Sequence, residues 1–338
     1  MRALRWAGPG AMTVGEVDEP VAVAGEVVVT VHRVGICGSD VTAYRGNMGI
    51  ARPGDVRGHE FAGVVTAVAD NVDRAWLGRR VAVNAQVTCG KCWACRNDTD
   101  NLCPHLQIIG VHRAGAFAER VAVPARNLIA VDDTVTAQLA ATAEPLAQAC
   151  HDVQLVLPAE PRSVLVIGAG SIGNLVVQAA RLLGIPEITV VEPHPQRRAA
   201  AVAAGAETTV ESTDVAAAVA AARPEGGFDV VFDVVGVAGT RTAAVGLARP
   251  GGQVVLVGLH TDVHELSWFP VIRREVVLRG ANCYDRGDFA QAVAWLHAGE
   301  IRPPDTVRHV ILDEGPAVFA ELASGAVTVA KTYVTPAG

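Results

Sequence analysis

The N-terminal half of the chain holds a cysteine and a histidine whose surroundings suit metal chemistry. Cys37 lies in the segment Gly-Ile-Cys-Gly-Ser-Asp, and His59 follows in the segment Gly-His-Glu. Taken singly, a cysteine is often a small buried apolar residue, and a histidine is often a hydrogen-bonded core residue. Together they supply a thiolate and an imidazole, and the neighbouring glycines let the backbone approach a bound group.

A third metal ligand is needed, and Glu144 is the candidate. It is the lone charged side chain between residues 139 and 149. The rest of this segment is mostly apolar. Burying an unpaired carboxylate in an apolar segment costs several kcal/mol, unless a cation compensates its charge. The residue types therefore indicate a metal ion near Cys37, His59 and Glu144.

Four further cysteines follow the spacing C-x2-C-x2-C-x7-C, at Cys89, Cys92, Cys95 and Cys103. Four thiolates on a short loop can close a tetrahedron around Zn2+ at about 2.3 Å, which leaves no position for a substrate. Such a site organises a loop. The alternatives are two disulfides or free thiols, which a cytosolic location disfavours, and an iron–sulfur cluster, which uses similar ligands.

A glycine-rich turn in the second half of the chain predicts a dinucleotide site. The strand-like run Val164–Ile167 leads directly into this turn, and a helix with one apolar face begins at Ser171. The turn has the pattern G-x-G-x-x-G, from Gly168 to Gly173. This pattern alone is weak evidence for a dinucleotide site. Between a strand and a helix it is specific, because its glycines bring a pyrophosphate to the helix N-terminus. We expect the cofactor to contact Gly168, Gly170, Ser171, Ile172 and Gly173.

The choice between NAD and NADP depends on Glu192 and Arg197. Glu192 ends the second strand, Ile188–Val191, at the distance from the glycines where a carboxylate binds the adenosine ribose. This carboxylate would repel a 2′-phosphate, which favours NAD; the alternative is a solvated charge at the end of a strand. Arg197 could instead receive a 2′-phosphate. NAD is the prediction.

The elements that position these residues change along the chain. To about residue 124 the sequence shows short β-type runs punctuated by glycine, such as 26–31 and 64–68. From about residue 161, strands alternate with helices, which predicts βαβ units and a parallel sheet. One helix, 288–297, and two short β-like runs, 307–312 and 331–334, then follow. We expect these last elements to pack on the N-terminal domain.

The predicted organisation is therefore two domains. A β-rich catalytic domain comprises residues 1–150 and 285–338 and carries the cysteine lobe, 89–103. A dinucleotide-binding domain, 151–284, is inserted into it. The length of 338 residues agrees with two domains.

The composition argues against several classes of function. The chain has 28 basic and 35 acidic side chains, a formal net charge of −7, which disfavours binding of nucleic acid by phosphate neutralisation. No leader-like segment follows Met1, and no apolar run reaches the ~18 residues of a membrane span. We expect a soluble cytoplasmic protein that binds neither nucleic acid nor membrane.

Several independent motifs together point to one family. The sequence resembles the zinc-dependent medium-chain dehydrogenase/reductases of the alcohol dehydrogenase superfamily, in the sorbitol and threonine dehydrogenase branch with its polyol and cyclitol (inosamine-type) relatives. The resemblance covers nearly the whole chain in the family's order. The motifs are Gly35–Asp40, Gly58–Gly63, the four-cysteine lobe, Gly115–Glu119, Glu144–Leu146 and the glycine-rich turn.

This resemblance implies the fold and the metal ligands. It implies a GroES-like β-rich catalytic domain and a Rossmann domain with a doubly wound parallel sheet. Cys37, His59 and Glu144 match the catalytic zinc ligands, and Glu60 lies beside the metal, either as an alternate ligand or acting through a bound water. The four-cysteine lobe matches a structural zinc site, so we expect two zinc ions per chain.

The resemblance also assigns residues to substrate and cofactor. Ser39 matches the hydroxyl residue that contacts the substrate oxygen. Tyr44 either lines the substrate pocket or is a packed aromatic. Many relatives have a proton-relaying histidine where this chain has Thr42, so the relay runs through ordered water, another histidine or the cofactor ribose. A basic residue five positions after the ribose acid, here Arg197, accompanies NAD in this branch.

The implied function is oxidoreduction. A hydride passes between NAD and a secondary alcohol, namely a polyol, cyclitol or amino alcohol, to give a ketone. Zinc with three protein ligands keeps a fourth position for the alcohol and acidifies it. The alternatives are a zinc reductase that uses NADPH on aldehydes or ketones, which Glu192 disfavours, and a non-catalytic binding protein, which we would expect to lack the open metal site. The resemblance further implies a homodimer or homotetramer.

Overall fold

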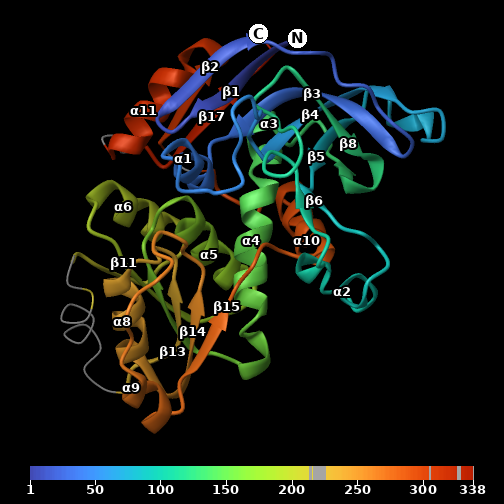
Figure 1. Cartoon of the computed structure of the whole chain (residues 1–338). Helices are drawn as coiled ribbons and strands as arrows, with labels where there is room; N and C mark the ends of the chain where they lie inside the picture. Colours follow the sequence, from blue (N-terminus) through green and yellow to red (C-terminus); the bar gives the residue numbers. More distant parts are fainter. Residues whose placement is uncertain (213–214, 216–225, 304–305, 326–328, 338) are drawn as a thin grey trace. The chain divides into compact units, whose positions relative to one another are not determined.

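The computed structural model describes residues 1–212, 215, 226–303, 306–325 and 329–337 (Figure 1). The chain divides into two compact units. The first unit comprises Met1–Glu144 and Asp285–Gly338, and the second, Pro145–Tyr284, is inserted between these segments along the chain. The boundary between the first segment and the inserted unit lies after Glu144, whereas the sequence predicted it after residue 150. Helix α4 (Ala143–Gln154) continues across this boundary, so no turn residues mark it in the sequence.

The first unit is built on a seven-stranded sheet with the order β16-β17-β3-β4-β5-β9, in which β8 also pairs with β3. These strands are β3 (Glu26–Gly35), β4 (Glu60–Val68), β5 (Arg80–Val83), β8 (Arg120–Pro124), β9 (Leu128–Ala130), β16 (Val307–Ile311) and β17 (Lys331–Thr335). Two smaller two-stranded sheets pair β1 (Arg2–Gly8) with β2 (Ala11–Glu16) and β6 (Gln86–Val87) with β7 (Gln107–Ile108).

Strand β3 lies at the centre of this unit because its run of valines is apolar on both faces. Val27, Val29 and Val31 on one face are fully buried in a core that also contains Phe61 and Phe117, and Val28 on the other face is 5% exposed. The end of β3 pairs with two strands from distant parts of the chain, β4 and β17. This end therefore brings three segments of the sequence to one place.

The second unit contains a six-stranded parallel sheet with the order β12-β11-β10-β13-β14-β15. Its strands are β10 (Ser163–Ile167), β11 (Glu187–Val191), β12 (Thr208–Val210), β13 (Phe228–Asp233), β14 (Ala248–Leu256) and β15 (Val277–Gly280). Every residue of β10 is buried, as expected for a strand covered on both faces. The strand order reverses between β10 and β13, which is the position where such sheets bind ligands. This topology confirms the predicted Rossmann sheet.

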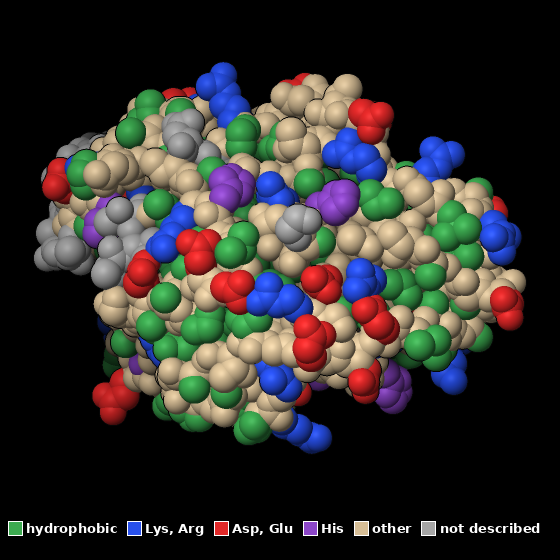
Figure 2. Space-filling view, turned by 90° about the horizontal axis from the view of Figure 1, so that it is seen from above, with side chains coloured by type: hydrophobic (Ala, Val, Ile, Leu, Met, Phe, Trp, Pro, Cys, Tyr) green, Lys and Arg blue, Asp and Glu red, His purple; other side chains and the backbone are tan. Residues whose placement is uncertain are grey.

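The helices connect and cover these sheets. They are α1 (Gly38–Tyr44), α2 (Trp93–Arg96), α3 (Ala137–Ala141), α4, α5 (Ser171–Leu182), α6 (Pro195–Ala204), α8 (Ala238–Leu247), α9 (Trp268–Arg273), α10 (Arg286–His297) and α11 (Gly315–Ser324). Among the described helices, none has both the length and the apolar character needed to cross a membrane. Basic and acidic side chains are interspersed over the face seen in Figure 2.

Candidate metal and nucleotide sites

The pairing of β3 with β4 assembles the first candidate metal site. Gly35 at the end of β3 lies opposite Glu60 at the start of β4. Cys37 follows just after β3 and His59 just before β4, so the pairing brings their side chains together. The ligand atoms of Cys37, His59 and Glu60 all lie within 4.8 Å of one another. A thiolate, an imidazole and a carboxylate at this spacing can hold one zinc ion.

Backbone hydrogen bonds fix the position of Cys37. Cys37 is the N-cap of α1, and its N–H donates to Asp40 Oδ2 at 3.1 Å. The preceding residue, Ile36, donates its N–H to the Thr332 carbonyl of β17 at 2.9 Å. The thiol is therefore held between a helix start and a sheet strand.

The charges around His59 make the site attractive to a cation. Burial opposes protonation of its imidazole, but the negative groups of Asp40, Cys37 and Glu144 raise its pKa well above the usual value. His59 Nδ1 lies 3.8 Å from Asp40 Oδ1, too far for a hydrogen bond, and within the described residues neither buried atom has a hydrogen-bond partner. A pocket that stabilises an imidazolium in this way also fits a divalent metal ion.

Glu144 enters this site from the start of α4. It is the second residue of that helix, where a negative charge interacts favourably with the helix dipole. Its charge acts on His59, but its carboxylate is outside the group formed by Cys37, His59 and Glu60. The structure thus places two carboxylates near the cysteine and the histidine, and Glu60 lies with them in the tighter group.

Two buried cations near this site carried no recognisable signal in the sequence. Arg57 is 1% exposed, and its Nε lies 3.5 Å from Asp40 Oδ1. Lys331 of β17 forms an ion pair with Glu60. Although burial disfavours the charged amine, Glu60 is the main group that raises the pKa of Lys331. Both cations balance acidic groups that contact the metal ligands or lie among them.

The predicted substrate-side residues all lie on α1. Ser39 is the second residue of this helix and is half-buried. The Thr42 hydroxyl donates to the Gly38 carbonyl at 3.1 Å. Tyr44 is 8% exposed and packs against Phe319 of α11, with ring centroids 5.8 Å apart. This placement of Tyr44 in the core favours the packed-aromatic alternative over a role in lining the pocket.

The four-cysteine lobe forms a second candidate metal site. One sulfur from each of Cys89, Cys92, Cys95 and Cys103 lies within 4.8 Å of the others. The Cys89–Cys95 and Cys92–Cys95 sulfur distances are 3.9 and 3.4 Å. A tetrahedron with metal–sulfur bonds of about 2.3 Å has edges of about 3.8 Å, which this spacing approaches. The sulfurs are too far apart for disulfides, and all four cysteines are free.

Backbone amides in the lobe donate to these sulfurs, which favours a thiolate at Cys89; at Cys92 the Cys95 amide acts in the same direction, but burial and the neighbouring cysteine side chains raise the pKa to about 11. Cys92 N–H donates to Cys89 Sγ at 3.4 Å, and Cys95 N–H donates to Cys92 Sγ at 3.5 Å. The backbone N–H of Lys91 is the main cause that lowers the pKa of Cys89 to about 6. Donors of this kind stabilise the deprotonated form that binds zinc.

The glycine-rich turn joins β10 to α5 as predicted. Gly168 has a φ of +95°, which favours glycine, and Gly170 is the N-cap of α5. A side chain at Gly173 would overlap the Gly168 carbonyl oxygen. These requirements explain Gly168 and Gly173, whereas a Cβ at Gly170 would meet nothing within 4 Å, so the helix N-terminus is open to an anion.

Glu192 lies beside this turn rather than on the surface. It is 3% exposed, and its Oε2 accepts the Ala169 N–H at 2.9 Å while Oε1 accepts the His194 N–H at 3.0 Å. Each carboxylate oxygen has a second lone pair that can accept a ribose hydroxyl. The solvated-charge alternative is therefore not supported by its burial.

The two neighbouring arginines differ in their contacts. Arg197 is half-buried, whereas Arg198 donates to the carbonyls of Glu192 and Pro193 at 2.9 and 2.7 Å and pairs with Glu211. Arg198 is thus the residue that ties helix α6 to the end of β11. The sequence reasoning missed it because two adjacent arginines look equivalent.

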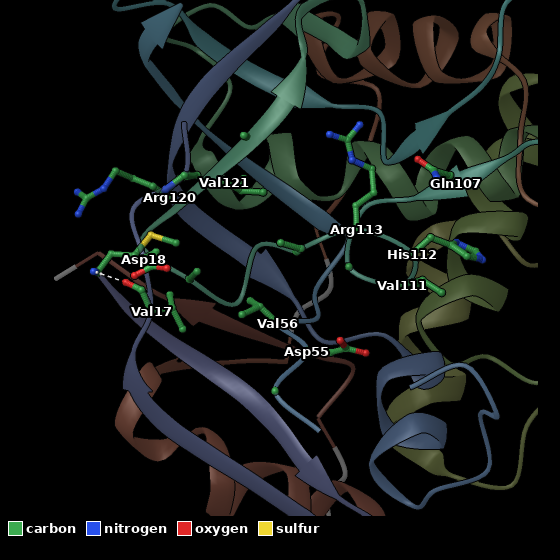
Figure 3. A pocket seen from close by; sticks show the side chains of 18 of the residues that line it. Val17, Asp18, Asp55, Val56, Gln107, Val111, His112, Arg113, Arg120 and Val121 are labelled. Carbon is green, nitrogen blue, oxygen red and sulfur yellow. Dashed lines mark hydrogen bonds between the residues drawn. The ribbon is translucent and has the colours of Figure 1, made fainter. Parts of the chain in front are cut away.

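A separate cavity of about 960 Å3 lies in the first unit (Figure 3). Charged side chains such as Asp18, Asp55 and Arg120 occur around it, and Arg113 in its wall pairs with Glu26. The described residues that line it include none of the predicted metal, substrate or cofactor residues.

Comparisons with known proteins agree with this geometry. Residues 23–133 match the alcohol dehydrogenase GroES-like domain, and residues 171–298 match the zinc-binding dehydrogenase family. The chain is 34% identical over 281 residues, 82% of each protein, to 2-dehydro-3-deoxy-L-galactonate 5-dehydrogenase of Pseudoalteromonas atlantica.

Two solved structures cover 99% of this chain and of their own chains. One is an Escherichia coli CFT073 alcohol dehydrogenase (rspB) in complex with NADH, with 29% identity and a TM-score of 0.90. The other is a Sinorhizobium meliloti zinc-binding dehydrogenase bound to NADP, with 30% identity and a TM-score of 0.88.

Proposed function

Because the chain belongs to the zinc-binding dehydrogenases that carry an alcohol dehydrogenase GroES-like domain, we propose that it oxidises a secondary alcohol to a ketone at a zinc ion held by Cys37, His59 and Glu144. Membership of this family confirms the resemblance and the fold class inferred from the sequence. The chain is an oxidoreductase that acts on CH–OH groups with a nicotinamide dinucleotide.

One observation carries the assignment of the zinc site. The ligand atoms of Cys37, His59 and Glu60 converge within 4.8 Å in surroundings that stabilise positive charge. This group contains Glu60 and not Glu144, so Glu144 is proposed as the third ligand on the family resemblance and on its charge near His59, and Glu60 beside the metal either as an alternate ligand or acting through a bound water. Zinc, when bound, would acidify the substrate hydroxyl and polarise its oxygen.

The surrounding residues would orient the substrate and remove its proton. Ser39 on α1 would contact the substrate oxygen and accept its proton while giving its own hydroxyl proton to ordered water; the nicotinamide, when bound, would supply the hydride acceptor. Thr42 cannot easily continue this transfer, because its hydroxyl donates to the Gly38 carbonyl. We therefore place ordered water after Ser39 in the path to solvent.

A structural zinc ion in the four-cysteine lobe completes the proposed metal content. The free cysteines and their amide donors suit a zinc thiolate site, and a single ion fits their sulfur spacing better than a larger iron–sulfur cluster. The expected content is two zinc ions per chain. Unpaired thiolates also favour a reducing compartment, which supports a cytoplasmic location.

NAD is the proposed cofactor because Glu192 presents a buried carboxylate at the end of β11. The charge would repel a 2′-phosphate beside the glycine-rich turn. The second candidate function is an NADPH-dependent reductase of aldehydes or ketones. Half-buried Arg197 and the NADP-bound relative favour that alternative. Initial rates with NAD and NADP at equal concentration separate the two.

The proposed substrates are polyols, cyclitols and amino alcohols. The Pseudoalteromonas relative is named as the dehydrogenase of a hydroxylated sugar acid, which supports a substrate with several polar groups. Two neighbouring polar groups on the substrate could both contact the metal beside Ser39. A non-catalytic binding protein is disfavoured because Cys37, Ser39, His59 and Glu144 are all present.

A homo-oligomer is proposed from the edge of the parallel sheet. β15 is an edge strand, and its Val277 is 50% exposed. The preceding helix α9 exposes Trp268, Phe269 and Ile272 by 59–67%. An unpaired edge beside exposed aromatic residues suits association with a second copy. Analytical ultracentrifugation would show a monomer if this part of the proposal is wrong.

The decisive experiment combines activity with metal analysis. Protein purified without added metal should hold two zinc equivalents and reduce NAD with at least one member of a panel of alcohols, polyols, cyclitols and β-hydroxy amino acids. Glu144→Ala should lose catalytic zinc, whereas Ser39→Ala should keep zinc and lose turnover. Full zinc and full rate in Glu144→Ala would overturn the ligand assignment.

A further inference from the structure

The loops that follow β13 and β14 form one hydrogen-bonded unit at the carboxyl edge of the parallel sheet. The backbone N–H groups of Val257 and Gly258, after β14, donate to the Asp233 carbonyl at 3.0 and 2.9 Å. A side chain at Gly236, after β13, would overlap the Gly258 carbonyl oxygen. The two loops therefore pack backbone against backbone.

Two side chains take up the polar backbone groups of Val235 in this unit. Asp233, the last residue of β13, is fully buried, and its Oδ1 accepts the N–H groups of Val235 and Gly236 at 3.1 and 3.0 Å. His260 Nδ1 lies 2.6 Å from the Val235 carbonyl oxygen, and it is the donor there because a carbonyl oxygen can only accept. The Thr261 N–H donates to the Gly236 carbonyl at 2.9 Å. All four backbone polar groups of residues 235 and 236 are thus hydrogen-bonded.

The order of the strands places this unit on one side of the proposed cofactor site. The glycine-rich turn follows β10 and Glu192 follows β11, so the adenosine half of a dinucleotide would extend from the turn towards β11. Strand β13 pairs with the opposite edge of β10, so the nicotinamide half would extend towards β13 and β14. Val235 lies next to the turn itself, because a Cβ at Gly168 would be 2.6 Å from Val235 Cγ2.

We propose that Asp233 and His260 are positioning residues for the nicotinamide half of the dinucleotide, because they hold the backbone that follows β13 in the conformation to which this half binds. The inference rests on the proposed function, in which Glu192 binds the adenosine half. It goes further by assigning two side chains to the half of the cofactor that reacts. A segment that is already ordered loses little conformational entropy when a ligand binds, so its affinity for the ligand is higher.

The two side chains differ in what they contribute to the stability of the fold. Asp233 accepts both N–H groups through one oxygen, which the amide oxygen of asparagine can replace. Burial raises the pKa of Asp233, so a neutral amide is tolerated in its place. His260 is exposed, so water competes for its hydrogen bond and the bond adds little to the free energy of unfolding. Loss of the His260 side chain should therefore affect cofactor binding far more than stability.

The test compares the binding of two ligands by isothermal titration calorimetry. NADH carries both halves of the cofactor, whereas ADP carries the adenosine half alone. His260→Ala should weaken NADH binding by about fivefold and Asp233→Ala by about tenfold, because the freed backbone must be ordered when the nicotinamide half binds. Both variants should bind ADP within about twofold of the native affinity, because the adenosine half does not use this backbone.

Conservative variants show whether the two hydrogen-bonding side chains are responsible. The amide N–H of asparagine can take the place of His260 Nδ1, and its amide oxygen can take the place of Asp233 Oδ1. His260→Asn and Asp233→Asn should therefore bind NADH within about threefold of the native affinity.

Asp229→Ala is the matched control for Asp233→Ala. Asp229 lies near the start of the same strand, away from the carboxyl edge, and its Oδ2 accepts the N–H groups of Arg162 and Ser163 at 2.9 Å. Its loss should lower the Tm and change the affinity for neither ligand.

An equal loss of NADH and ADP affinity in His260→Ala would overturn the inference, because His260 would then support the whole nucleotide site rather than one half. Native NADH affinity in His260→Ala would also overturn it, and this result does not depend on whether Asp233→Ala folds. Native protein that does not bind NADH would instead refute the proposed function on which the inference depends.

Discussion

Replacing Gly35 by alanine is expected to disturb the metal centre without touching any proposed ligand. The new methyl group would lie 2.8 Å from Lys331 Cε and closer still to Glu60 Oε2. Both neighbours are fully buried and charged, so they cannot swing into solvent as exposed side-chain ends can. The φ of Gly35 is not in the left-handed region, so the backbone itself accepts alanine.

The expected loss in the free energy of unfolding lies between two limits. If the ion pair shifts as a unit, the cost is that of overpacking a core, about 1–3 kcal/mol. If the pair separates, an uncompensated buried charge costs about 3–5 kcal/mol. Alanine regains about 0.5–1 kcal/mol relative to glycine in a strand, which leaves a net loss of about 0–4.5 kcal/mol, centred near 2 kcal/mol. At about 2–4 °C per kcal/mol for a unit of this size, the central value lowers the Tm by roughly 4–8 °C.

Differential scanning calorimetry with parallel zinc analysis would measure this effect. Gly246→Ala is the matched control, because a Cβ at Gly246 in α8 meets nothing within 4 Å and alanine is the better helix former. It should leave the Tm unchanged or raise it slightly. A native Tm and native zinc content in Gly35→Ala would refute the argument that the ion pair is seated against this glycine.

Three further predictions concern other parts of the chain. Glu192→Ser should raise kcat/KM for NADP relative to NAD at least tenfold, measured by initial rates, and an unchanged ratio would mean that another residue sets the preference. Cys92→Ser should lose one zinc equivalent and lower the Tm, since a structural zinc site contributes its binding energy to folding. Cys283 lies outside both proposed zinc sites, so Cys283→Ser should retain two zinc equivalents. Burial opposes ionisation of Asp229, but the Arg249 side chain and two backbone N–H groups lower its pKa to about 2. The stability that Asp229 contributes is therefore full above pH 4 and lost as the pH falls towards 2. The shift corresponds to about 2 kcal/mol, and solvent exposure reduces this to about 1 kcal/mol. Urea unfolding of Asp229→Asn should show that loss at pH 7 and none near pH 2, and an equal loss at both would contradict the ion-pair origin.

The features that were predictable from the sequence are those set by local spacing. The glycine-rich turn involves residues only a few positions apart. Gly168 is needed for its positive φ, and Gly173 is needed because a side chain there would overlap the Gly168 carbonyl oxygen. The cysteine lobe is equally local, because Cys89 to Cys103 close on one loop. The parallel sheet follows from buried runs such as β10. In each case the physical cause lies within one short segment.

The features that were missed depend on pairing between distant segments. Lys331 lies in a short β-like run, and only the placement of β17 beside β3 shows that its ammonium reaches Glu60. Arg57 has the same character, since a charged residue beside a glycine usually indicates a surface turn. For Tyr44 the sequence leaves two alternatives, a pocket residue or a packed aromatic, and its contact with Phe319 of α11 supports the second.

The two candidate metal sites differ in how much of the chain must be present before they can form. The cysteine lobe closes a loop of few residues, so its ligands can meet early in folding at little entropic cost. The catalytic group needs the pairing of β3 with β4, and the contact beside it between Tyr333 of β17 and Thr142 spans 191 residues of sequence. Contacts of such separation form late. We therefore expect zinc to enter the lobe first during refolding, and stopped-flow loading of the refolding chain would show the reverse order if this is wrong.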